Sequence, residues 1–318
     1  MSHVERIGPA APPTRVLHDD VTFDVQDVSE FARHFLAIIE RGDDRGEQYY
    51  EKDPRAGRIT AALARVGVTR IKEIIGYGSF GVAATTTDER VVKLTGDITE
   101  VQVGAALIGK NLAHVVHVYG SWFIRDVDIQ VEAGWNEKDQ EIIYKDSRAG
   151  ILIEQRIRAL GPGPDRESLS NFVYAWRSEG HHRFMDYVNL SAKAKRARLE
   201  VASVELEKQL NAEATTGRVD GALFHDVARA LGELRRVGIF AIDVHGGNVG
   251  FDERAGHYRI FDVGVGSPPV GGPRPKVVGP ADTQTRHTTV RREEVATRRE
   301  TAHELADAIA LPMSVMEI

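Results

Sequence analysis

The chain has 318 residues, of which 42% are hydrophobic and 28% charged, a composition typical of a folded globular protein. Its formal net charge of -6 at pH 7 argues against a general nucleic-acid-binding protein, which needs a positive surface. The absence of cysteine excludes disulfides, thiolate nucleophiles and cysteine-based zinc sites, and it fits a cytoplasmic protein. Because no uninterrupted apolar run reaches the roughly 18 residues that a membrane-spanning helix needs, we expect no membrane partner.

The N-terminal part, residues 1–67, is expected to be a leader followed by a helical extension. Three prolines between positions 9 and 13 prevent regular structure in the leader. Apolar residues recur with the helical period from Asp27 to Arg41, and a second, shorter helix is expected over Ile59 to Val66. We expect these helices to pack over the domain that follows.

Residues 71–94 predict three strands with a glycine-rich turn, Gly-Tyr-Gly-Ser-Phe-Gly, between the first two. A dinucleotide-binding fold would need a helix to begin inside the glycine motif, but no helical period starts before about Asp97. A glycine hairpin instead lets backbone N–H groups approach phosphate oxygens. Lys93, on the third strand, would supply the positive charge that phosphates need, although a lysine at the solvated end of an edge strand gives the same pattern.

The rest of residues 68–157 predicts one helix, over 97–110, and two more strands, over 115–124 and 150–157. The polar stretch between these strands, residues 126–148, is interpreted as an inserted hairpin or loop. The fold expected for 68–157 is therefore a five-stranded antiparallel sheet with one helix.

Residues 158–318 are expected to be mainly helical. Helices are predicted over 167–176, 192–212 and 220–237, whereas the proline-rich stretch 266–280 predicts an extended loop.

Three polar residues follow predicted strand ends in the stretch 238–264. An apolar run ends at Asp243, a glycine-containing turn carries Asn248, and a second short strand delivers Asp262. Carboxylate and amide oxygens are hard ligands, which suit Mg²⁺ bridged to phosphates. The alternative is an ordinary glycine-rich turn, in which Asp and Asn serve the turn itself.

This spacing, Asp-x-x-x-x-Asn followed by Asp-x-Gly, resembles the catalytic and metal-binding pair of the protein-kinase-like superfamily. The form Asp-Val-His-Gly-Gly-Asn is most similar to the aminoglycoside and choline phosphotransferase branch and to atypical bacterial Ser/Thr kinases. The resemblance implies an α+β, bilobal fold, with an N-lobe over 68–157 that binds nucleotide and a mainly helical C-lobe over 158–318. It implies Asp243 as catalytic base, with Asn248 and Asp262 as ligands of Mg²⁺.

The same resemblance implies catalytic roles for Lys93 and His245, although His245 is as well explained as a brace of the loop. It implies that Glu100 pairs with Lys93, with Glu73 and Asp97 as alternatives, and that Phe80 covers the phosphates. The backbone of about 154–156 would bind the adenine edge. The implied residues for nucleotide binding are Gly76, Gly78, Ser79, Phe80, Gly81, Lys93, Glu100, Glu154 and Arg156.

The function implied is ATP- and Mg²⁺-dependent phosphoryl transfer to a hydroxyl group, with Ser or Thr of a protein as the first candidate acceptor. A small-molecule phosphotransferase, a nucleotide-binding pseudokinase and a nucleotidyltransferase are the alternatives. Ala241 and Ile242 replace the His-Arg pair common in protein kinases, which argues against control by a phosphorylated activation loop. The threonine-rich stretch 283–289 is a predicted site of autophosphorylation.

Overall fold

The computed structural model describes residues 16–18, 21–23, 27–40, 52–78, 80–136, 141–180, 190–263 and 266–280. All helices and strands in these ranges belong to one compact unit, Met1–Gly279. The described part is a mixed α+β structure, which confirms the α+β part of the expected fold. None of its helices is long and apolar enough to cross a membrane. The predictions for 283–289, Ser79 and Gly264 lie outside the described residues.

Six of the α-helices expected from the sequence are present in the described part, with shifted ends, and those expected over 184–190 and 293–310 fall, except for Leu190, on residues outside it. The six are α1 (Val28–Ile39), α3 (Pro54–Arg65), α4 (Ile98–Leu107), α5 (Pro164–Glu179), α7 (Ala192–Ala214) and α8 (Gly221–Arg236), and a 3-10 helix η1 (Gly246–Asn248) follows. Aspartates begin four of them as side-chain caps. Asp27, Asp53, Asp97 and Asp220 each accept at least one hydrogen bond from a backbone N–H group of the first turn.

The main sheet has the strand order β13-β6-β7-β5-β4-β3. Its strands are β3 (Ile71–Gly78), β4 (Gly81–Thr86), β5 (Arg90–Thr95), β6 (Val118–Asn136), β7 (Glu141–Gln155) and β13 (Lys276–Val278). The first five pair antiparallel, whereas β13 joins β6 in parallel. The five strands β3 to β7 lie within the range 68–157, where five were expected, and β13, from outside this range, is a sixth strand that was not expected. Three residues are too few to show a strand period, and β13 lies in the proline-rich stretch interpreted as a loop.

The polar stretch 126–148 extends the sheet as a long hairpin. β6 and β7 remain paired from Asp128 with Arg148 to Asn136 with Glu141, after an irregularity that follows Phe123. The shorter strands are β1 (Val16–His18), β2 (Val21–Phe23), β8 (Arg158–Ala159), β9 (Phe240–Ala241), β10 (Val249–Asp252), β11 (His257–Ile260) and β12 (Gly266–Ser267). They form a β1-β2 pair, a β11-β10-β8 sheet and a β12-β9 pair.

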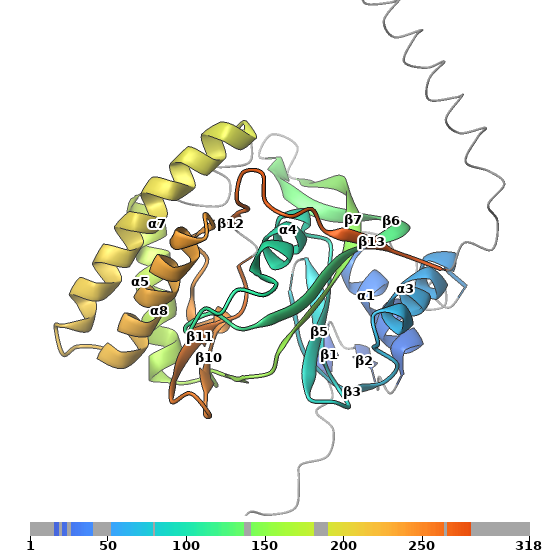
Figure 1. Cartoon of the computed structure of the whole chain (residues 1–318), viewed down its shortest axis with the longest axis horizontal. Helices are drawn as coiled ribbons and strands as arrows, with labels where there is room; N and C mark the ends of the chain where they lie inside the picture. The colour runs from blue at the N-terminus through green and yellow to red at the C-terminus, as the bar shows by residue number, and fades with distance from the viewer. Residues whose placement is uncertain are drawn as a thin grey trace, which may run out of the picture. The chain divides into compact units, whose positions relative to one another are not determined.

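Helices cover both faces of the main sheet (Figure 1). On one face, Phe35 of α1 and Leu63 of α3 share an apolar core with Leu94 and Ile153 of the sheet. On the other face lies α4, where a Cβ at Gly104 would come within 2.8 Å of Leu152 Cδ2. The glycine therefore lets α4 approach β7 closely. The N-terminal helices thus form part of the core of the sheet.

A second apolar core joins α5, α7 and α8 to the strands that precede and follow the Asp243 loop. Leu206 of α7, Leu231 of α8 and Val173 of α5 are fully buried in it. The helix α8 ends at Arg236, and Gly238, whose φ of +78° favours glycine, turns the chain towards β9. This rigid framework delivers Asp243 two residues after β9.

The first prediction concerns the packing of α1 on the sheet. Phe35→Ala removes a fully buried ring and leaves a cavity, so we expect the free energy of unfolding to fall by about 3–5 kcal/mol. Equilibrium urea unfolding followed by circular dichroism measures the change. The control is Val201→Ala on α7, where the side chain is 67% exposed, and its effect should stay below about 0.5 kcal/mol. An equally small effect of Phe35→Ala would contradict a core that includes α1.

Candidate functional site

Lys93 joins two carboxylates that come from distant parts of the chain. Its Nζ lies 2.5 Å from Oε1 of Glu100 in the first turn of α4, and 2.8 Å from Oδ2 of Asp262, which follows β11. Asp97 fixes the start of α4 by accepting the N–H of Thr99 at 2.7 Å, and so places Glu100 over β5. The resulting Lys93–Glu100–Asp262 cluster connects the sheet, α4 and the segment after β11.

Burial and neighbouring charges change the ionisation of this cluster. Burial raises the pKa of Glu100 to about 7, and the charge of Lys93 offsets this effect only in part because Asp262 and Asp97 lie nearby. Burial disfavours the ammonium of Lys93, but the carboxylates of Asp262 and Glu100 outweigh it and raise its pKa. Lys93 therefore keeps its positive charge at neutral pH.

The glycine hairpin connects β3 to β4, next to the strand that carries Lys93. A Cβ at Gly81 would lie 2.4 Å from the carbonyl oxygen of Leu94, so glycine is required there by the approach of β5. Gly76 and Gly78 face open space. The ring of Phe80 is half-buried against the apolar core that α1 and α3 share with the sheet. The sequence analysis had placed this ring over the phosphates of a nucleotide. Apolar side chains of that core provide a better environment for the ring than water.

In the loop after β9, side chains of the predicted site residues form hydrogen bonds with backbone groups of the same loop. The side-chain amide of Asn248 donates from Nδ2 to the carbonyl oxygen of Asp243 at 2.8 Å. His245 caps η1, and its Nδ1 accepts the N–H of Gly247 at 3.0 Å. The proton of the neutral ring therefore belongs on Nε2, which lies 3.9 Å from Oδ1 of Asp243. His245 thus braces the loop and also faces Asp243.

One face of α5 contacts this loop along its whole length, and the sequence interpretation missed it. Arg177 donates from Nη1 to Oδ1 of Asp243 at 2.8 Å, and Ser170 Oγ accepts the N–H of Gly246 at 3.1 Å. The ring of Tyr174 lies 5.6 Å from that of His245, centre to centre.

Residues 170, 174 and 177 lie on one side of a helix by spacing, so a polar stripe was visible in the sequence. The partner of this stripe could not be predicted from the sequence, because the loop that it contacts lies more than 60 positions further along the chain.

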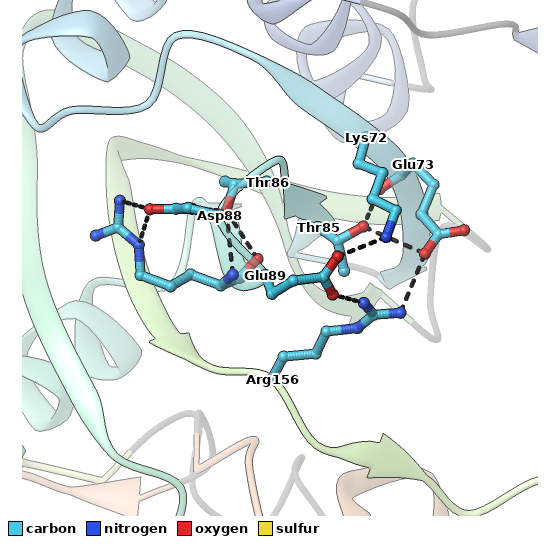
Figure 2. A network of polar contacts seen from close by, with 8 residues as sticks. Lys72, Glu73, Thr85, Thr86, Asp88, Glu89 and Arg156 are labelled. Atoms are coloured by element: carbon cyan, nitrogen blue, oxygen red, sulfur yellow. Dashed lines mark hydrogen bonds and ion pairs between the residues drawn. The ribbon is translucent and has the colours of Figure 1, made fainter.

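The residues predicted to bind adenine separate into two environments. Glu154 is buried, and burial together with the nearby charge of Glu100 raises its pKa to about 8. Arg156 instead makes ion pairs with Glu89 and with Glu73 at the outer strands of the sheet (Figure 2). Lys72 also pairs with Glu89, at 2.5 Å. The side chain of Arg156 is therefore bound in this surface network, as is Glu73, the alternative partner considered for Lys93.

Asn248 and Asp262 supply oxygen atoms of the kind that Mg²⁺ prefers. The amide nitrogen of Asn248 is used by Asp243, which leaves the amide oxygen for a cation. Within the described ranges, no group of three or more His, Cys, Asp or Glu side chains is arranged to hold a metal ion. One carboxylate and one amide fit Mg²⁺ only when a ligand such as a polyphosphate supplies further oxygens, which is the usual arrangement for this ion.

Neither protein-family models nor curated proteins give a match to this chain.

The second prediction tests the contact between α5 and the Asp243 loop. In Gly246→Ala, the new Cβ would lie 2.3 Å from the carbonyl oxygen of Arg166, so the helix or the loop must shift. We expect a loss of about 1–3 kcal/mol of unfolding free energy, measured by thermal unfolding. Gly57→Ala on α3 is the matched control, since nothing lies within 4 Å of its Cβ, and it should stabilise by about 0.5–1 kcal/mol. Unchanged stability of Gly246→Ala would disprove the close contact.

The third prediction follows from the raised pKa of Glu154, about 8 in the folded chain. The folded chain binds more protons than the unfolded chain between about pH 4.5 and pH 8, so the contribution of Glu154 to stability falls as pH rises through that window. Glu154→Gln cannot ionise. Relative to wild type, we expect similar stability near about pH 5 and a gain on the order of a few kcal/mol at about pH 8.5.

Unfolding free energies at the two pH values measure this difference. The control is Glu200→Gln, at an exposed position of α7. A difference between Glu154→Gln and wild type that does not grow with pH would contradict the burial of this carboxyl group.

Proposed function

We propose that the chain transfers the γ-phosphoryl group of Mg²⁺-bound ATP to a hydroxyl group, with Ser or Thr of a protein as the acceptor. The observation that carries this proposal is the pair of contacts from Lys93 to Glu100 and to Asp262, at 2.5 and 2.8 Å. A charged lysine held by a helix carboxylate, beside a second carboxylate at a strand end, suits the binding of nucleotide phosphates. The glycine hairpin on the neighbouring strands supports it.

Lys93 positions the phosphates through its charge, and Glu100 holds the lysine side chain in place. The side chain of Lys93 is 17% exposed, which suits the approach of a nucleotide oxygen from one side. Glu100 is 3% exposed and is therefore shielded from water, which strengthens its pairing with Lys93. Because the two are on different elements, their contact also fixes α4 relative to β5.

Asp243 orients the acceptor hydroxyl and accepts its proton. Its Oδ1 is held by Arg177, which leaves Oδ2 to face the acceptor. The side chain of Asn248 holds the backbone of Asp243 by a hydrogen bond. The Nε2–H group of His245 places a partial positive charge near Oδ1 of Asp243, in addition to the charge of Arg177. Arg177 is thus a positioning residue, since it acts on the hydroxyl only through Asp243.

The residues that would hold Mg²⁺ are Asn248, through its amide oxygen, and Asp262. When bound, the ion neutralises negative charge on the phosphates. Asp262 is 32% exposed, the most accessible of the three members of the Lys93 cluster. This exposure suits a ligand that enters from solvent.

A small-molecule hydroxyl is the second candidate acceptor, and the path of the chain after Asp262 favours it. β12 pairs at once with β9, and β13 then joins the main sheet at Trp122. Among the described residues, this leaves little chain between Asp262 and β13 to form a peptide-binding segment. The catalytic arrangement is the same for both acceptors.

The fourth prediction is that incubation with Mg²⁺ and ATP adds phosphate to the purified wild-type chain and not to Asp243→Asn, which lacks the carboxylate that accepts the proton. Intact mass spectrometry measures the increment, and peptide mapping shows whether residues 283–289 carry it. The control is Asp126→Asn, at an exposed site whose φ of +53° asparagine also tolerates, and it should be phosphorylated like wild type.

The other possible outcomes of this experiment would each support a different function. An AMP increment would indicate nucleotidyl transfer. No increment, together with ADP release upon addition of aminoglycosides or other small alcohols, would assign the small-molecule acceptor. Nucleotide binding without turnover would indicate a pseudokinase, and the absence of both binding and turnover would overturn the proposal.

A further inference from the structure

Arg166 belongs to the contact between α5 and the Asp243 loop, and the proposed mechanism does not use it. It lies in the first turn of α5, on the same helix face as Ser170 and Arg177, because residues four or eleven positions apart align along a helix. Its carbonyl oxygen is the atom that a Cβ at Gly246 would meet. The face of α5 that follows the loop therefore begins with a cation.

The guanidinium of Arg166 has no carboxylate partner among the residues that the structure describes. Its hydrogen bond there runs from Nη1 to the carbonyl oxygen of Leu160 at 3.3 Å, and the residue is exposed. Asp165 and Glu167 are its neighbours on α5, but adjacent residues of a helix do not face each other. The positive charge of Arg166 is therefore available to a ligand.

Arg166 reaches the loop close to His245, which in turn faces Asp243. Its Nη2 lies 3.5 Å from the position that a Cβ at Gly247 would take, and that position is 2.8 Å from Cε1 of His245. The adjacent ring atom, Nε2, lies 3.9 Å from Oδ1 of Asp243. The path from guanidinium to carboxylate is therefore no longer than about 12 Å, which an extended chain spans in roughly three or four residues.

The charges along this contact favour an acidic acceptor. Asp243 and Arg177 form an ion pair at 2.8 Å, so their charges offset each other. His245 carries no negative charge in either protonation state. Arg166 is thus the unpaired charge among these four side chains, and it attracts an anionic group near the acceptor hydroxyl and repels a cationic one.

We propose that Arg166 binds a carboxylate of the acceptor, so that the substrate is a Ser or Thr with Asp or Glu within roughly three or four residues of it. The inference rests on the proposed phosphoryl transfer and adds a specificity-determining residue to it. A guanidinium can hold a carboxylate through two parallel hydrogen bonds. Because Nη1 bonds to Leu160, Nη2 and Nε remain to form them.

The test measures kcat/KM of the full chain on three peptides that differ only in charge. Each peptide has one central Ser, with Glu, Gln or Lys at the three positions on either side. With Mg²⁺ and ATP, we expect wild type to prefer the Glu peptide to the Gln peptide at least about threefold, and to the Lys peptide by more. In Arg166→Glu the order should reverse, mainly through KM, because the side chain contacts the acceptor and not the reacting atoms.

Two controls separate this effect from a general one. Lys208→Glu, at an exposed position of α7, makes the same change of charge and should keep the wild-type order of peptides. ADP with Mg²⁺, measured by calorimetry, should bind wild type and Arg166→Glu with dissociation constants within about threefold of each other. A larger loss of ADP affinity in Arg166→Glu would assign Arg166 to the nucleotide and overturn the inference.

The failure of this inference can be told from the failure of the proposed function. Equal rates on the three peptides, or the wild-type order retained in Arg166→Glu, would overturn the inference and leave phosphoryl transfer intact. Transfer to none of the peptides would also overturn it, since an acidic peptide must then be a substrate. The mass increment of the chain itself after incubation with Mg²⁺ and ATP decides separately on the proposed function.

Discussion

The ion pairs of Lys93 are the interaction on which the rest of the site depends. One ammonium contacts Glu100 and Asp262, and the chain between Lys93 and Asp262 spans 169 positions. Removing one member of a buried ion pair leaves an uncompensated charge, which costs more than the pair gains. The cap at Asp97 and the close approach at Gly104 therefore matter mainly because they hold α4 where Glu100 reaches Lys93.

A second arrangement, independent of the first, positions Asp243. The polar face of α5 supplies Arg177 to the carboxylate and Ser170 to the loop backbone, and Gly246 allows the two elements to touch. Both arrangements use the same principle. A glycine permits a close approach, a helix presents polar side chains at that point, and an apolar core on the far side keeps the helix in place.

Local signals account for what the sequence predicted correctly. The helices follow from the apolar periodicity of their sequences. The position of β13 in the sheet could not be predicted in this way, because its three residues are too few to show a period. They pair with β6 because the chain runs back to the main sheet after β12. Arg177 was missed for the same reason, since its partner is 66 positions away.

The charge balance of the site bears on which form of nucleotide it suits. Lys93 is already compensated by Glu100 and Asp262, and Arg177 by Asp243, so the charges of these two side chains are paired. A free triphosphate would bring several negative charges towards two cations that carboxylates already neutralise. A divalent cation bound with the phosphates supplies that charge, and Asn248 and Asp262 offer the oxygen ligands for it. The acidity of the site is therefore the physical reason to propose a metal-bound rather than a metal-free nucleotide.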